Sequence, residues 1–196
     1  DEKMEQSEVQ LIEATNPIGK IQLGLDDIIR KTLKTKIKLN SVGHTKSTKT
    51  KYRTDFSMHF CDDDFGYLSD KVDKVISDYL KEKLYTVNCW GISYNQNEEA
   101  IPHIHPKAPW VWTYYVDCCE NCSPLVFTKR NIKVKPNIDQ LIFFNGVLDG
   151  DIYNLNEHVV FPQRCEHERV VVSGNIEYID GVPRSSEDRL SFYKRG

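Results

Sequence analysis

The sequence has no apolar run long enough to cross a bilayer, so no membrane-spanning helix is predicted. It also has no excess of charge of one sign, because 26 Lys and Arg residues stand against 29 Asp and Glu residues, for a net charge of −3. Proteins that bind nucleic acids usually concentrate their basic residues, whereas this chain mixes them with acids. Neither a nucleic acid nor a membrane is therefore predicted as a partner. The length fits one domain, residues 1–196.

A second cysteine pair of the zinc-binding kind is also missing. The chain has six cysteines but a single CxxC, Cys119–Cys122, which gives little support to a four-cysteine zinc site. A chain of this length can build a core without disulfides, and the reducing cytoplasm is the predicted compartment. The CxxC could be a redox pair or the turn of a hairpin between strands at 110–116 and 124–127. We favour the turn.

A calcium loop is absent as well. Asp62, Asp63 and Asp64 lack the glycine and the distal glutamate that such a loop requires. The acidic run fits the entry to a helix, since negative charge stabilises a helix N-terminus. Apolar residues at helical spacing predict this helix up to residue 80, with Ser69 or Asp70 as its N-cap.

The first residues predict two strands and a short helix. Segments 9–12 and 18–25 are expected to be strands on either side of a turn. Asp26 or Asp27 could cap a short helix that runs through Leu33.

A basic segment and a further strand precede the long helix. Segment 31–51 is rich in lysine, and we interpret it as a solvated connection; the alternative is a basic loop that steers an acidic ligand. Segment 54–60 alternates between apolar and polar residues, which predicts a strand. His59 falls on its polar side and is expected at the surface.

From Leu84 onward the pattern changes to short strands without helices between them. The predicted strands are 85–94, 103–105, 110–116, 124–127, 132–135, 141–144, 158–161 and 169–179. Such spacing favours a sandwich or barrel. Because the helices come first, we predict an α+β fold: a double-stranded β-helix, or jelly roll, with supporting N-terminal helices and a core at roughly 84–180.

The strongest chemical signal comes from histidines. His103 and His105 are two residues apart in a segment rich in strand formers, so both imidazoles are predicted to share one face. His158 begins an apolar strand and is the predicted third member, whereas His167 lies in a charged segment where a loop is expected. The pattern predicts a mononuclear metal centre; the alternative is three unrelated histidines on sheet surfaces.

Six motifs follow one another in the second half of the chain. They are Ile101-Pro-His-Ile-His-Pro, Trp112-Thr-Tyr-Tyr-Val, Pro124-Leu-Val-Phe, Asp139-Gln-Leu-Ile-Phe-Phe, Glu157-His-Val-Val-Phe-Pro and Arg169-Val-Val-Val-Ser-Gly-Asn. This ordered set resembles the iron(II)- and 2-oxoglutarate-dependent oxygenases. Within them it is most similar to the prolyl-hydroxylase-like branch and to predicted phage and bacterial oxygenases with an HxH motif. The resemblance covers about residues 85–178, and its most specific part is the distance from His158 to Arg169.

The resemblance implies a role for each matching residue. The histidine of the family's HxD motif falls on His103, its aspartate on His105 and its distal histidine on His158, which makes these three the implied iron(II) ligands. The arginine that binds the distal carboxylate of 2-oxoglutarate falls on Arg169. A tyrosine that often assists it falls on Tyr115.

Two features depart from the family's pattern. Histidine replaces aspartate at position 105, and the glycine common before strand 141–144 is absent. With three neutral histidines the metal keeps two positive charges, which the 2-oxoglutarate dianion would offset. Ser173 shares a strand face with Arg169 by alternation, so it is a further candidate for contact with 2-oxoglutarate.

Three functions follow as hypotheses. The leading one is an oxygenase (dioxygenase) that couples oxidative decarboxylation of 2-oxoglutarate by O2 to hydroxylation of an unidentified substrate, with iron(II) as cofactor. The second is a cupin-like three-histidine metal protein that does not use 2-oxoglutarate. The third is a catalytically silent jelly-roll binding module. The position of Arg169 after His158 favours the first over the second.

Overall fold

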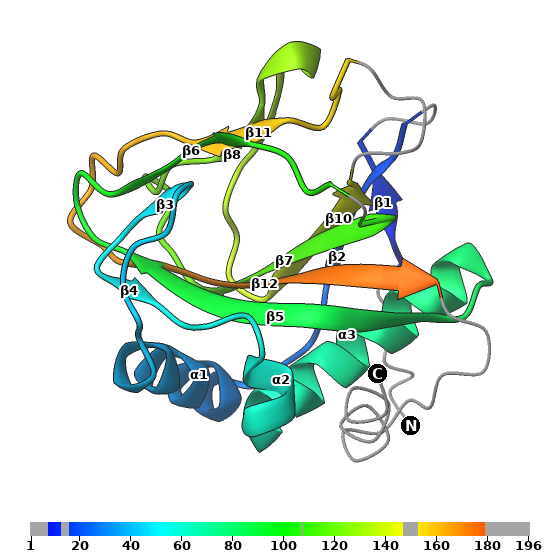
Figure 1. Cartoon of the computed structure of the whole chain (residues 1–196), viewed down its shortest axis with the longest axis horizontal. Coiled ribbons are helices and arrows are strands. Elements are labelled where there is room, and N and C mark those ends of the chain that lie inside the picture. Colours follow the sequence, from blue (N-terminus) through cyan, green and yellow to red (C-terminus); the bar gives the residue numbers. More distant parts are fainter. Residues whose placement is uncertain (1–7, 13–15, 107, 147–152, 179–196) are drawn as a thin grey trace, which may run out of the picture.

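The structure, a computed structural model, describes residues 8–12, 16–106, 108–146 and 153–178. Two antiparallel β-sheets lie face to face, and three helices cover the outer face of the larger sheet (Figure 1). This arrangement is the predicted jelly roll with supporting N-terminal helices. In the described part of the chain, no helix is long and apolar enough to cross a membrane.

Both sheets combine strands from the two halves of the chain. The larger sheet has the order β1 (Gln10–Leu11), β2 (Ile18–Gln22), β10 (Gln140–Asn145), β7 (Trp110–Asp117), β12 (Arg169–Tyr178), β5 (Leu84–Tyr94) and β4 (Tyr52–Arg53). The smaller sheet has the order β3 (Thr48–Lys49), β6 (Glu99–His103), β11 (His158–Val160), β8 (Leu125–Phe127) and β9 (Ile132–Val134). The helices are α1 (Asp27–Leu39), α2 (Met58–Cys61) and α3 (Asp63–Leu80), and a 3₁₀ turn, η1 (Thr128–Arg130), follows β8. The strands β1 to β4 thus extend a core that was predicted only from residue 84 onward.

Strand β12 serves two layers of the fold. Val170, Val172 and Ile176 pack in the apolar cluster between the larger sheet and the helices. The alternate residues, from Arg169 to Asn175, line the space between the two sheets. Because side chains alternate along a strand, one face of β12 packs towards the helices and the other lines the space between the sheets.

Helix α1 is longer than predicted. Asp26 is the N-cap, as expected, and its carboxylate accepts a hydrogen bond from the Ile29 N–H. The helix continues past Leu33 to Leu39, because Ile37 extends the apolar stripe by one turn and both Leu33 and Ile37 are fully buried. The lysines before residue 39 therefore lie on a helix and not in a solvated connection. Three of them pair with carboxylates: Lys34 with Asp117, Lys36 with Asp62 and Asp64, and Lys38 with Glu168.

The strand predicted at residues 54–60 is not formed. Thr54 and Ser57 make only isolated bridges, to Ser41 and Cys89, and the one-turn helix α2 follows. His59 is 1% exposed instead of lying at the surface, and its Nε2 is 3.2 Å from the Thr86 carbonyl oxygen. Phe56, an apolar residue of this alternating segment, is 46% exposed. Within α2, Met58 and His59 are both buried, because neighbouring side chains of a helix do not alternate between two faces as they do in a strand.

Helix α3 begins earlier than predicted. Its N-cap is Asp62 and not Ser69 or Asp70, because the Asp62 carboxylate accepts hydrogen bonds from the N–H groups of Asp64 and Phe65. Acidic residues fill its first turn, which confirms the acidic helix entry. Phe65 is fully buried, so the apolar stripe starts before the segment from which the helix was predicted.

The CxxC does not form the turn of a hairpin. Strand β7 before it belongs to the larger sheet, whereas strand β8 after it pairs with β11 and β9 in the smaller sheet. Cys119–Cys122 therefore lies on a connection that crosses from one sheet to the other.

Close packing of α1 on β5 depends on Gly91. A Cβ atom at this position would lie 2.3 Å from Ile37 Cγ1.

We predict that Gly91→Ala lowers the free energy of unfolding by about 1–3 kcal/mol, because a methyl group is forced into a filled space. Ile37→Ala alone should cost about 2–5 kcal/mol. The double variant should cost clearly less than the sum, because the new methyl group occupies the space vacated by Ile37. Urea unfolding of the four proteins measures this coupling, and additive costs would show that the two positions do not touch.

Candidate metal centre and its cavity

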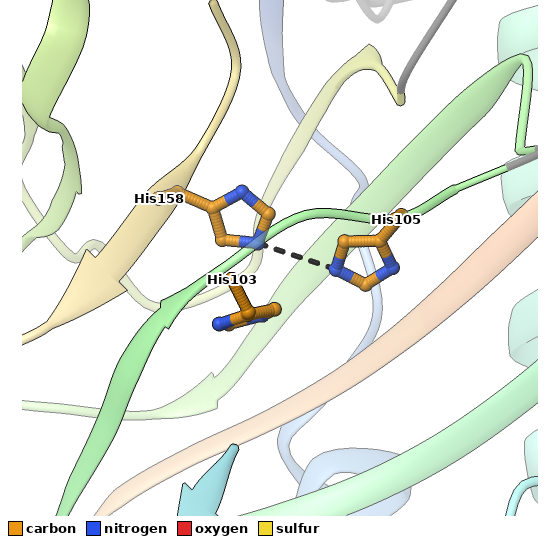
Figure 2. A group of neighbouring side chains, drawn as sticks. All are labelled: His103, His105 and His158. Carbon is orange, nitrogen blue, oxygen red and sulfur yellow. Dashed lines mark hydrogen bonds between the residues drawn. The ribbon is translucent and has the colours of Figure 1, made fainter. Parts of the chain in front are cut away.

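Three histidines, His103, His105 and His158, meet between the two sheets; we call them the histidine triad (Figure 2). His103 ends β6 and His158 begins β11, and the two residues are direct partners in the antiparallel register. Their ring centroids are 4.3 Å apart, and the His105 ring lies 5.3 Å from His103 and 5.1 Å from His158. One nitrogen of each ring lies within 4.8 Å of the others. The spacing of three such atoms suits one metal ion.

His105 reaches the triad by a different route from the one predicted. Strand β6 ends at His103, so His105 lies beyond it and does not follow regular strand alternation. Its ring is nearly parallel to that of Trp90, with the centroids 6.0 Å apart. The irregular backbone after β6, and not the period of a strand, therefore brings its imidazole to the other two.

The Nδ1 atom of every triad histidine faces an oxygen. Nδ1 of His103 lies 2.8 Å from the Ile101 carbonyl oxygen, and Nδ1 of His158 lies 2.8 Å from the Asn156 carbonyl oxygen. Nδ1 of His105 lies 2.8 Å from Oδ1 of Asn175. Because a carbonyl oxygen only accepts, each Nδ1 carries the proton, and each Nε2 is left with a lone pair. Metal-binding histidines usually have such a partner on the other ring nitrogen.

The Nε2 atoms of His105 and His158 are 3.2 Å apart, as the dashed line in Figure 2 indicates. With the protons on Nδ1, this contact sets two lone pairs against each other, which is unfavourable without a cation nearby. Burial and the neighbouring imidazoles lower the pKa of His158 well below its usual range, and burial lowers the pKa of His105 to about 4. Burial also lowers the pKa of His103. A proton is thus disfavoured, and a metal ion fits this donor set better.

A cavity of about 220 Å³ adjoins the triad and extends between the sheets. Arg169 lines it and is 1% exposed. Its Nε donates to the Ser123 carbonyl oxygen at 2.9 Å and its Nη2 donates to the Tyr115 hydroxyl at 3.1 Å. Among the described residues, no carboxylate pairs with this guanidinium, and Nη1 donates to none of them. A buried cation without a counter-ion is costly, so the cavity is suited to an anion.

The other two predicted residues lie on the same sheet face as Arg169. The Tyr115 hydroxyl contacts the guanidinium but does not line the cavity. Ser173 does line it, and its Oγ lies 3.0 Å from the Thr113 Oγ1. His167 lies outside the triad, in the predicted loop, with Nε2 2.9 Å from an Asp117 carboxylate oxygen.

Sequence reasoning missed several residues around the cavity. Asn175 holds His105, and its amide also donates to Oδ1 of Asn88 at 3.1 Å. Strand alternation from Arg169 could have found Asn175, because the two positions share a face. Tyr94, under the Arg169 guanidinium, and the buried Arg53 had no such signal, since Tyr94 is placed by the pairing of β5 with β12 and Arg53 by the pairing of β4 with β5.

The lowered pKa values predict an acid-sensitive fold in the metal-free protein. Unfolded imidazoles titrate near 6.5, whereas the triad stays neutral to a lower pH, near 4 for His105. Between these values the unfolded chain binds more protons, so stability should fall as the pH drops from about 7 towards 4. Urea midpoints measured in chelator should fall less steeply for His158→Gln than for the wild type. The exposed His44, changed to Gln, is the matched control and should leave the pH dependence unchanged.

Comparison with known proteins finds likeness in structure and not in sequence. No protein-family model matches the sequence, and no curated protein matches it. The viral collagen prolyl hydroxylase from Paramecium Bursaria Chlorella virus-1 in its 2-oxoglutarate complex is 19% identical, with a TM-score of 0.65 over 83% of this chain and 96% of that one. HygX from Streptomyces hygroscopicus with nickel and 2-oxoglutarate bound is 9% identical, with a TM-score of 0.63 over 85% and 84%.

A third solved structure has a different stated reaction. The non-heme alpha-ketoglutarate-dependent epimerase SnoN from nogalamycin biosynthesis is 9% identical, with a TM-score of 0.64 over 83% of this chain and 78% of that one. At such identities the likeness concerns the fold. The chain has the jelly-roll fold of these 2-oxoglutarate-related proteins.

Proposed function

We propose that this protein is an iron(II)- and 2-oxoglutarate-dependent oxygenase. The observation that carries the proposal is one cavity lined both by three inward-facing imidazoles and by a buried arginine without a carboxylate partner among the described residues. A cation-binding donor set and an anion-binding guanidinium in one enclosed space suit a metal with a chelating dicarboxylate. The structural neighbours include proteins with 2-oxoglutarate in their names, which supports the proposal.

His103, His105 and His158 would hold the iron(II). Imidazole nitrogens with open positions beside them suit non-haem iron(II), for which two histidines and one carboxylate are the usual set. A third histidine in place of the carboxylate leaves one more positive charge on the metal. A dianionic co-substrate compensates for that charge. The Nδ1 contacts already fix the ring orientation that such binding requires.

Arg169 would bind the distal carboxylate of 2-oxoglutarate. Its planar guanidinium matches a carboxylate, and Nη1, which donates to none of the described residues, remains as a donor. Tyr115 fixes the guanidinium through Nη2, and the Ser123 carbonyl fixes it through Nε. We assign Tyr115 to positioning Arg169 and Ser173, which lines the cavity, to direct contact with 2-oxoglutarate.

Iron(II) with bound 2-oxoglutarate supplies oxidative decarboxylation by O2 coupled to oxidation of a substrate. The protein's own residues orient the reactants and limit the entry of water. Apolar walls such as Val160 and Val171 serve the second task. Hydroxylation of a C–H bond is the finer reaction that we propose. SnoN is named an epimerase, so a shared fold alone does not decide the outcome.

Anaerobic titration tests the proposal directly. Iron(II) followed by 2-oxoglutarate should produce a visible charge-transfer band in the wild-type protein, because the keto acid chelates the metal. His158→Ala should give no band, and His44→Ala should give the wild-type band. A wild-type protein that binds iron without a band on addition of 2-oxoglutarate would favour the cupin-like alternative.

Arg169→Lys separates the two parts of the site. We predict normal iron binding but about tenfold to a hundredfold weaker 2-oxoglutarate binding, because a charge-assisted bidentate contact is worth on the order of 1.5–3 kcal/mol. Isothermal titration of the iron-loaded or nickel-loaded protein measures the change. An unchanged affinity would remove Arg169 from the co-substrate site.

Position 105 tests the ligand set. Alanine at 103 or 158 should abolish tight iron binding, and His167→Ala should have little effect, because His167 lies outside the triad. His105→Ala should weaken binding, whereas His105→Asp should retain the metal, since it restores the more usual carboxylate. Iron affinities measured anaerobically check this series. Full affinity in His105→Ala would mean that two histidines suffice.

A further inference from the structure

Three cysteines from two distant connections meet next to the segment that supports Arg169. Cys119 and Cys122 lie between β7 and β8, and Cys165 lies between β11 and β12. Their sulfur atoms all lie within 4.8 Å of one another. We call Cys119, Cys122 and Cys165 the thiol cluster. It is separate from the histidine triad and plays no part in the function proposed above.

The distances between the sulfur atoms distinguish a disulfide from a shared metal ion. The Cys122 Sγ lies 3.7 Å from the Cys119 Sγ and 3.7 Å from the Cys165 Sγ. A disulfide needs about 2.05 Å, so these distances exclude a bond in this structure. Two sulfurs bound to one zinc ion at about 2.3 Å in a tetrahedral arrangement lie about 3.8 Å apart. Both distances agree with that value.

A backbone N–H group also contacts the cluster. The Cys119 N–H donates to the Cys122 Sγ at 3.3 Å. Such N–H groups stabilise negative charge on sulfur and orient it, as outer partners of metal ligands do. Cys122 is buried, whereas Cys119 and Cys165 are partly exposed, which leaves the ion a route of entry.

We propose that the thiol cluster binds a zinc ion. Three thiolates are soft ligands that select zinc over the harder divalent metals. Among the described residues, no fourth histidine, cysteine or carboxylate atom belongs to the group, and the nearby His167 ring is engaged with Asp117. The fourth position is therefore taken by a water molecule from the exposed side.

The bound ion would join two connections that other contacts already bring together. The Ser123 N–H donates to the Gln163 side-chain oxygen at 3.0 Å, and the Ser123 hydroxyl donates to the Pro162 carbonyl oxygen at 3.3 Å. The Ser123 carbonyl oxygen accepts the hydrogen bond from Arg169 Nε. Zinc at the adjacent Cys122 would thus stabilise the segment on which the guanidinium rests.

Metal analysis of the protein purified under reducing conditions tests the proposal. We expect one zinc ion per chain, lost in Cys122→Ser and in Cys165→Ser. Cys61→Ser is the matched control, since Cys61 is an exposed cysteine on α2, and it should keep the zinc. His167→Ala should keep it too. Loss of zinc from His167→Ala would overturn the three-cysteine assignment with a water ligand, and zinc retained in Cys165→Ser would overturn the cluster.

Cobalt(II) gives a second readout that does not depend on the folding of cysteine variants. Added to reduced, metal-free His158→Ala protein, cobalt(II) should produce the intense near-ultraviolet absorption of thiolate-to-cobalt charge transfer. The altered histidine triad cannot produce this absorption, so failure of the oxygenase proposal would leave the result unaffected. A reduced, folded protein that shows no such absorption and takes up no zinc would refute the zinc site.

Discussion

The pairing of β11 with β6 is the interaction on which the candidate metal centre depends. It sets His158 directly opposite His103, although the two residues belong to different parts of the chain. Residues that face each other across an antiparallel pair have neighbouring side chains, so this one register brings two imidazoles together. A shift by one residue would turn His158 to the other face of the smaller sheet and remove the site.

The space between the two sheets combines these paired histidines with groups from the larger sheet. The smaller sheet contributes His103 and His158, and the larger sheet contributes Arg169 and Asn175 from the same face of β12. Burial keeps the imidazoles neutral and shields the guanidinium from bulk solvent. This space has lone pairs at one place and, at another, a cation that pairs with no carboxylate of the described residues. It therefore favours a metal together with an anionic ligand, which links the geometry to the proposed chemistry.

The connections between the sheets add the remaining constraints. The segment from Cys118 to Ser123 crosses from the larger sheet to the smaller one and supports Arg169 through the Ser123 carbonyl. The connection that carries Cys165 returns from the smaller sheet to the larger. Both connections adjoin Arg169. A zinc ion in the thiol cluster would therefore fix the position of Arg169, although the cluster is separate from the histidine triad.

The sequence by itself determined the strand-rich second half and the amphipathic helices, because these follow from local periodicity. It grouped His103, His105 and His158 through an ordered set of motifs, although the strand period predicted for His105 was not the reason that its imidazole joins the other two. It could not place the helix boundaries, and it put His59 at the surface, since tertiary burial overrides a short alternating pattern. Only the tertiary structure decided that Asn175 holds His105 and that Cys165 joins the CxxC. Both contacts link residues far apart in the chain, and only the pairing and packing of the strands bring such residues within bonding distance.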